Sequence, residues 1–104
     1  MSMTRRERVL AALNHQQPDR GPIDLGGTYA STVYFTAYEK LKRHMGLQHD
    51  VEMSMRRGRC PVPHSSVLDY FDVDTRLLAL SPYEGGYQRD LDEDSFVDEW
   101  GAVW

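Results

Sequence analysis

The sequence predicts an α+β fold in which helices are followed by a short β-hairpin, and we expect one small domain spanning residues 1–104. Apolar residues at helical spacing occur within residues 4–71, whereas two short apolar runs flank an acidic loop at residues 92–95. The length of 104 residues suits a single small domain. It is too short for a complete (β/α)₈ barrel, which needs roughly 200 residues or more.

The first predicted elements are a helix, a turn and a short strand. Thr4 and Glu7 have the spacing of a capping box, which predicts that a helix begins after Thr4. The predicted apolar face of this helix consists of Val9, Leu10 and Leu13. Pro18 ends any continuation of the helix, and residues 23–25 form a strand candidate that the glycines at 26–27 close.

A second helix is predicted from a cap at Ser31 or Thr32 to Gly46, with cationic residues in its last turns. Its apolar stripe consists of Val33, Ala37, Tyr38, Leu41 and Met45. Residues 50–57 are ambiguous, because their alternation favours a strand or extended chain while the flanking residues could cap a short helix. We favour the strand or extended chain.

The remaining elements are short. Two prolines exclude a helix at residues 59–63. A third helix is expected from Ser65 or Ser66 to Phe71, with Val67, Leu68 and Phe71 on its apolar side. The chain is then predicted to form a buried strand at 75–80, a loop at 81–86, and a hairpin of residues 87–91 and 96–100.

Composition and charge favour a soluble, cytoplasmic protein. The mean hydropathy of -0.59 and the lack of a long apolar run exclude a membrane-spanning helix, and the polar start predicts no signal peptide. A single cysteine suits a reducing compartment. Residues 1–60 hold ten Lys and Arg against six Asp and Glu, whereas residues 61–104 hold two against ten. This split indicates solvated surfaces of opposite sign or an interaction surface.

Potential metal ligands do not form a recognisable site. The nearby soft-ligand pairs are His44 with His49 and Cys60 with His64, whereas a structural zinc site needs four ligands at tight spacing. Alternating aspartates at residues 90–94 lack the glycine and glutamate that complete a calcium-binding EF-hand loop. We therefore predict no metal site in this chain.

The sequence predicts neither a nucleic-acid partner nor a catalytic residue. Residues 56–59 (RRGR) are basic enough to contact phosphate, but the whole chain is acidic and no aromatic residue separates the arginines. Residues 26–28 lack the spacing and the lysine of a phosphate-binding loop. Cys60 has only His64 nearby as a base, and the neighbouring prolines favour a plain loop.

Five segments nevertheless follow a familiar order: residues 4–15 (TRRERVLAALNH), 18–24 (PDRGPID), 37–42 (AYEKLK), 71–76 (FDVDTR) and 98–104 (DEWGAVW). In this order they resemble the start of uroporphyrinogen decarboxylase family proteins. The resemblance is greatest to the branch that includes corrinoid-dependent methyltransferases. It covers most of the chain, and residues 50–64 match least well.

The resemblance implies a TIM-type (β/α)₈ barrel, of which this chain would be the N-terminal portion. It also implies corrinoid and zinc for the full-length enzyme. The zinc-binding His and Cys residues of such enzymes lie further along than Trp104, so we expect no cofactor within this chain. True decarboxylases carry an arginine-rich stretch after the first strand to hold substrate carboxylates, but residues 25–29 contain no arginine. The resemblance therefore favours methyl transfer over decarboxylation.

Two hypotheses about function follow. In the first, the chain is a truncated or stand-alone N-terminal segment of such a methyltransferase-type protein and is inactive alone. Active-site loops of TIM barrels follow the strands, so this hypothesis places substrate-binding residues after the first strand candidate. They are Asp24, Gly26, Gly27 and Thr28.

In the second hypothesis, the chain is a small non-enzymatic protein that oligomerises or binds a partner. A barrel fragment exposes strand edges and an apolar face. The expected partner is a second copy of the chain or the missing C-terminal barrel portion, with no nucleic acid and no membrane. The candidate interface residues are Phe96, Val97, Trp100, Val103 and Trp104.

Overall fold

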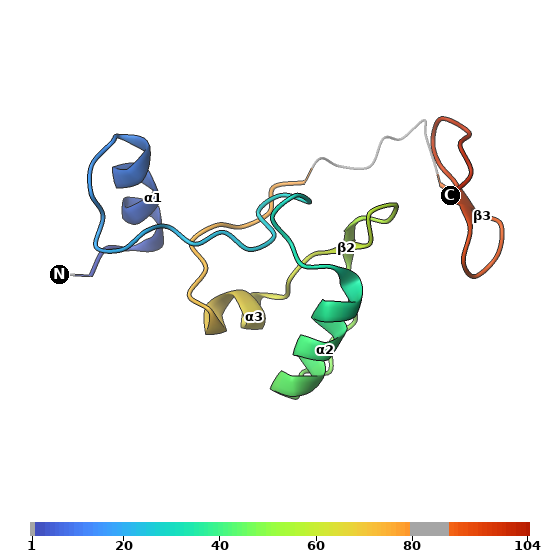
Figure 1. Cartoon of the computed structure of the whole chain (residues 1–104), viewed down its shortest axis with the longest axis horizontal. Coiled ribbons are helices and arrows are strands. Elements are labelled where there is room, and N and C mark those ends of the chain that lie inside the picture. Colours follow the sequence, from blue (N-terminus) through green and yellow to red (C-terminus); the bar gives the residue numbers. More distant parts are fainter. Residues whose placement is uncertain (1, 80–87) are drawn as a thin grey trace.

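A computed structural model describes residues 2–79 and 88–104, and its helices and strands confirm an α+β fold (Figure 1). In chain order these are α1 (Arg5–Leu13), α2 (Phe35–Met45), β1 (Met53–Met55), β2 (Cys60–Pro61), α3 (Ser65–Tyr70), β3 (Arg89–Asp90) and β4 (Phe96–Val97). β1 pairs antiparallel with β2, and β3 pairs antiparallel with β4. The described strands form two separate two-stranded sheets and do not close a barrel.

Helix α1 has the predicted start but a different buried face. The Thr4 hydroxyl accepts from the Glu7 N–H, and the Glu7 carboxylate accepts from the Thr4 N–H, which confirms the capping box. The predicted apolar face is wrong in part, because Leu13 is 70% exposed while Arg8 and Ala11 are buried. Carboxylates from distant segments surround Arg8, so a charged side chain occupies the inner face of the helix.

Helix α2 ends as predicted but begins later. Gly46 has the left-handed φ of +68° and closes the helix through its N–H, as expected for a glycine at this position. The predicted cap at Ser31 or Thr32 is wrong: the N-cap is Tyr34, which makes no side-chain capping bond. The Ser31 hydroxyl donates to the Thr28 carbonyl and the Thr32 hydroxyl donates to the Pro61 carbonyl, so neither is available as a cap.

The expected strand character within residues 50–57 is confirmed by β1, which pairs with β2 across a tight turn at residues 56–59. Arg59 in this turn has a φ of +48°, a left-handed conformation that is uncommon for a non-glycine residue. Helix α3 begins at Ser65 and buries Val67 and Leu68 as predicted, but Phe71 is 42% exposed instead of buried. Its N-cap is His64, whose ring accepts the Ser66 N–H at 3.2 Å.

The predicted strands at residues 23–25 and 75–80 are wrong over their described residues. The structure has no regular secondary structure at 23–24 and 75–79, and Leu78 is 94% exposed instead of buried. The Asp74 N–H donates to the Ile23 carbonyl, but no further ladder bonds follow between these segments. Residue 80 and the predicted loop at 81–86 lie outside the described residues.

The C-terminal hairpin is confirmed by β3 and β4, although Tyr87 at its predicted start lies outside the described residues. Arg89 pairs with Val97, and Asp90 pairs with Phe96. Phe96 and Trp104 exchange two backbone hydrogen bonds of 2.8 and 2.9 Å, so the last residues of the chain fold back along β4. Residues 89–104 are called the C-terminal hairpin below.

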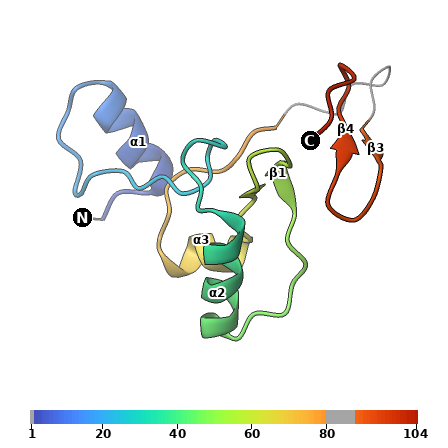
Figure 2. The ribbon, with the colours of Figure 1, turned by 45° about the vertical axis from the view of Figure 1, so that its right-hand side comes forward.

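The described chain is a thin layer with a small core. Its extents are 54 × 33 × 18 Å, with α1 at one end and the C-terminal hairpin at the other (Figures 1 and 2). The radius of gyration is 16.8 Å, whereas a compact domain of this length has about 13 Å. The buried hydrophobic residues are Ala11, Tyr38, Val67, Leu68, Val73 and Phe96. No helix among the described residues is long and apolar enough to cross a membrane.

Candidate functional site

The predicted substrate-binding residues lie together in one turn after residue 23. The Asp24 carboxylate accepts the Gly27 N–H at 3.0 Å and also accepts the Thr75 hydroxyl. The Thr75 hydrogen bond holds the pKa of Asp24 below its ordinary value, which keeps the carboxylate ionised. Thr28 is exposed and bonds to Ser31 through its backbone N–H at 3.1 Å. The geometry brings these residues together, and their substrate-binding role stays a prediction.

The two glycines in this turn are required by close packing. Gly26 is buried with a φ of +74°, and a Cβ there would lie 2.5 Å from Cδ of Pro63. A Cβ on Gly27 would collide with the Asp24 carboxylate and approach the Thr75 hydroxyl to 3.1 Å. The turn is therefore held against the segments before α3 and after it.

A cluster of arginines and aspartates joins the two ends of the first 79 residues. The buried Arg8 guanidinium donates to Asp19 through Nε and Nη2 at 2.6 and 2.9 Å, and to Asp74 through Nη1 at 2.6 Å. Arg20 donates to the other oxygen of Asp74 at 2.6 Å. We call Arg8, Asp19, Arg20 and Asp74 the arginine–aspartate cluster.

Asp74 is the centre of this cluster. Its side chain is fully buried and also accepts the Ile23 N–H at 2.8 Å. Burial alone would raise the pKa of Asp74, but the hydrogen bonds from the Ile23 N–H, Arg20 and Arg8 lower it to about 2. The carboxylate is thus ionised at neutral pH and accepts hydrogen bonds from α1 and from the segment at 18–24, so the cluster holds these segments together.

Sequence reasoning missed the arginine–aspartate cluster, although its residues lie in the motifs at 4–15, 18–24 and 71–76. The signal in the sequence was that several of these motifs contain Arg and Asp residues to which no role had been given. Exposed ion pairs continue the cluster outward: Arg5 with Asp69 and Asp72, Arg20 with Asp72, and Arg76 with Asp69. Such exposed pairs contribute little stability each.

The buried Tyr38, the half-buried His49 and the exposed His64 form a second polar group. The hydroxyl of the buried Tyr38 accepts the His64 N–H at 2.8 Å and lies 3.0 Å from Nε2 of His49. The His49 and His64 rings stack with centroids 4.3 Å apart. Burial, followed by the positive potential of His64 and Lys42, lowers the pKa of His49. A neutral His49 can accept a hydrogen bond from the Tyr38 hydroxyl. Because the same hydroxyl accepts the His64 N–H, Tyr38 links α2 to the start of α3.

Two arginines of the 56–59 turn attach the C-terminal hairpin. The Arg57 guanidinium carbon lies 5.1 Å from the Trp104 ring centroid and 5.4 Å from that of Trp100, and Nη1 lies 3.5 Å from Asp98. Arg56 lies 4.2 Å from the Phe96 ring centroid and pairs with Asp90. The basic and acidic halves of the chain therefore meet within the molecule at this point.

Asp98 organises the end of the hairpin. Its Oδ1 accepts the N–H groups of Trp100 and Ala102, each at 2.9 Å, and its Oδ2 accepts the Trp104 indole N–H at 2.8 Å. Burial opposes ionisation of Asp98, but these hydrogen bonds and the charge of Arg57 lower its pKa. The Asp98 carboxylate is consequently ionised where it faces Arg57.

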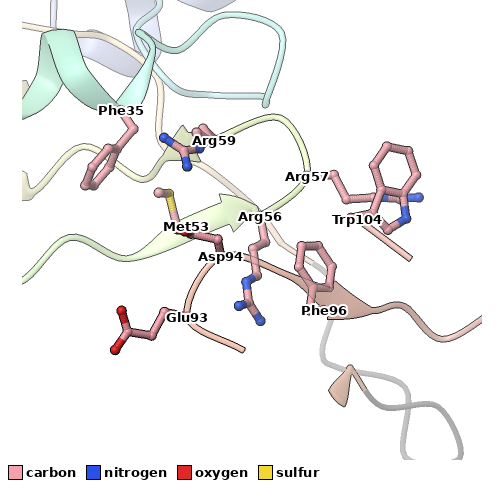
Figure 3. Close-up of a pocket in the computed structure, with 9 residues that line it drawn as sticks. All are labelled: Phe35, Met53, Arg56, Arg57, Arg59, Glu93, Asp94, Phe96 and Trp104. Carbon is pink, nitrogen blue, oxygen red and sulfur yellow. The ribbon is translucent and has the colours of Figure 1, made fainter. Parts of the chain in front are cut away.

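A cavity of about 450 Å³ lies between the 56–59 turn and the C-terminal hairpin (Figure 3). Its lining residues are Phe35, Met53, Arg56, Arg57, Arg59, Glu93, Asp94, Phe96 and Trp104. Sequence reasoning identified the basic cluster but missed this cavity, because the opposite wall is about forty residues further along the chain. We call it the inter-hairpin cavity.

The candidate interface residues differ in exposure. Phe96 is buried beneath Arg56 and Val97 is half-buried, whereas Trp100 is 74% exposed and Val103 and Trp104 are also exposed. Their role in an interface stays a prediction. Among the exposed members, Trp104 also lines the inter-hairpin cavity, and both indole rings lie near Arg57.

Residues 2–79 and 88–104 bring no three His, Cys, Asp or Glu side chains together in a way that could hold a metal ion. The zinc implied by the resemblance therefore has no ligand set among these residues. Comparison with known proteins finds no matching family model, no matching curated protein and no matching solved structure.

Proposed function

We propose that this chain is the leading segment of a uroporphyrinogen decarboxylase-like, methyltransferase-type barrel protein, in which it acts as scaffold and does not catalyse alone. The main support is the arginine–aspartate cluster. Arg8 from the first motif and Arg20 from the second both pair with the buried carboxylate of Asp74 in the fourth, and Arg8 also pairs with Asp19 of the second motif. Motifs that are separate in the sequence thus form one structural unit.

The surface of the chain also supports this proposal. The exposed area is 8005 Å², whereas a compact monomer of 12.0 kDa exposes about 6,000 Å². Large apolar side chains are exposed on α1 and on the segment after α3, notably Leu10, Leu13 and Leu78. Further protein packed against this layer would bury them.

In this proposal the remaining barrel supplies the corrinoid and zinc chemistry, and the turn of Asp24, Gly26, Gly27 and Thr28 faces the substrate. The reading frame after codon 104 tests the proposal directly. We expect coding sequence, in frame or shifted, that encodes a His-x-Cys pattern followed by a further Cys. A stop codon directly after codon 104, with no such coding sequence following it in any frame, contradicts the proposal.

The alternative is a small non-enzymatic protein that assembles with copies of itself. The exposed Trp100, Val103 and Trp104 at the end of the hairpin favour it. Light scattering on the purified chain over a hundredfold range of concentration separates the two. The alternative requires a dimer or larger species that Trp100→Ser weakens, and a strictly monomeric mass excludes it.

A further inference from the structure

We propose that the inter-hairpin cavity binds a small zwitterion, namely a free amino acid or dipeptide with an apolar side chain. This inference does not depend on the family resemblance, because residues 50–64, which form one wall, match the family least. The cavity volume of about 450 Å³ is within the range of roughly 300–1,000 Å³ found for small-molecule sites. Three features of its lining define the ligand.

The first feature is an available guanidinium. Arg56 and Arg57 are paired with Asp90 and Asp98, but Arg59 makes no ion pair with any described residue. The backbone of Arg59 is fixed, since its carbonyl accepts the Phe35 N–H at 3.1 Å. A guanidinium presents a planar pair of donors that matches a carboxylate. Arg59 would therefore hold the ligand carboxylate.

The second feature is a pair of carboxylates on the opposite wall. Glu93 and Asp94 make no ion pair with any described residue. The loop that carries them is shaped by Asp92, whose carboxylate accepts the N–H groups of Asp94 and Ser95 at 2.9 and 2.7 Å. Because Asp92 fixes the loop, the Glu93 and Asp94 side chains remain available for a ligand ammonium group.

The third feature is an apolar surface between the two charged walls. Figure 3 shows Met53 between Arg59 and Glu93, Phe35 beside Arg59, and Phe96 on the other side of Arg56. An apolar side chain placed there would be removed from water. The available charges are one guanidinium and two carboxylates, so a polyanion such as a nucleotide would meet net repulsion. A zwitterion can place its carboxylate at Arg59 and its ammonium group at Glu93 and Asp94.

Calorimetric titration of the full chain with L-phenylalanine and with Phe-Phe tests the proposal. We expect both to bind, and N-acetyl-L-phenylalanine and L-phenylalaninamide, which each lack one charge, to bind at least about tenfold more weakly. Equal binding of all four ligands, or binding of none, overturns the proposal. Binding of phenylethylamine as tightly as phenylalanine also overturns it, because Arg59 would then have no part.

Variants test which wall of the cavity binds which charged group of the ligand. Arg59→Gln should weaken the binding of phenylalanine but leave the binding of phenylethylamine unchanged. The double variant Glu93→Gln, Asp94→Asn should weaken the binding of both ligands. Lys40→Gln, an exposed change on α2 away from the cavity, is the matched control and should bind as the original chain does. Arg59→Lys keeps the charge at this strained position and should recover part of the binding. If circular dichroism shows each variant folded and Arg59→Gln binds phenylalanine normally, the proposal is wrong.

Discussion

The arginine–aspartate cluster and the attachment of the C-terminal hairpin use the same pair of residue types with different consequences. In the cluster, Arg8 is buried, both oxygens of Asp74 are occupied, and three donors from α1 and the 18–24 segment meet on Asp74. At the hairpin, Arg57 is partly exposed and lies over two indole rings, with a single 3.5 Å contact to Asp98. Both regions contain ion pairs, so ion pairs alone do not explain the difference. A contact between segments is strong where the charged groups are buried and each carboxylate accepts several hydrogen bonds, and it is weak where they are exposed.

The largest effect is expected from Asp74→Asn in the cluster. This change leaves the buried Arg8 without one of its counter-charges, and breaking a buried ion pair costs about 3 kcal/mol or more. Denaturant unfolding followed by circular dichroism measures the loss. Asp69→Asn is the matched control, since Asp69 is an exposed partner at the edge of the same network and should cost under about 1 kcal/mol. Equal losses for the two variants would contradict the comparison.

Acid should remove the next largest contribution. Asp74 has a pKa of about 2 in the folded chain, below its ordinary value of 3.8. A lowered carboxyl pKa stabilises the fold fully above pH 3.8, and this stability is lost as the pH falls through about 2. The contribution is on the order of 2 kcal/mol. Unfolding measured from pH 7 to pH 2 should show the original chain approaching Asp74→Asn only at the acidic end, and a constant difference across this range would refute it.

Two glycines with positive φ, Gly26 and Gly101, lie in tightly packed and in open surroundings respectively. Gly26→Ala introduces a Cβ against Pro63, whereas Gly101→Ala in the hairpin meets no atom within 4 Å. Both substitutions incur the strain of a left-handed backbone, about 1 kcal/mol. Only Gly26→Ala adds a steric cost, so we expect it to lower the free energy of unfolding by at least about 1 kcal/mol more. Thermal unfolding of the two variants side by side is the measurement.

The smallest effect is expected at the hairpin. Arg57→Gln removes the cation from the two indole rings and should cost under about 1 kcal/mol. Both tryptophans of the chain lie in the hairpin, so acrylamide quenching of their fluorescence reports its attachment. Quenching should increase in Arg57→Gln and in 1 M salt, and remain unchanged in Arg43→Gln on the exposed side of α2. No change in Arg57→Gln would mean that the hairpin is held by other contacts.

Sequence reasoning succeeded where the determinants of structure are local. The Thr4 and Glu7 capping box, the helix end at Gly46 and the hairpin around residues 92–95 each depend on residues a few positions apart. Such patterns are readable because the interacting groups are fixed by local backbone geometry.

It failed where the partner is distant. Residues 23–25 have the composition of a strand, but strand formation needs a neighbour to complete the ladder, and Ile23 meets Asp74 alone. The hydroxyl of Thr32 is taken by Pro61, 29 positions away, so it does not cap α2. Arg8 reads as a surface residue until its carboxylate partner, 66 positions later, is known. The inter-hairpin cavity was missed for the same reason.

The 66-residue separation between Arg8 and Asp74 has a consequence for synthesis of the chain on the ribosome. Translation proceeds from the N-terminus, so α1 and Asp19 emerge long before Asp74, the fully buried carboxylate partner of Arg8. Until then Asp19 is the carboxylate of the cluster that can pair with Arg8, and an isolated nine-residue helix is marginal. The first element to be made therefore gains its full set of partners only after residue 74 has left the exit tunnel.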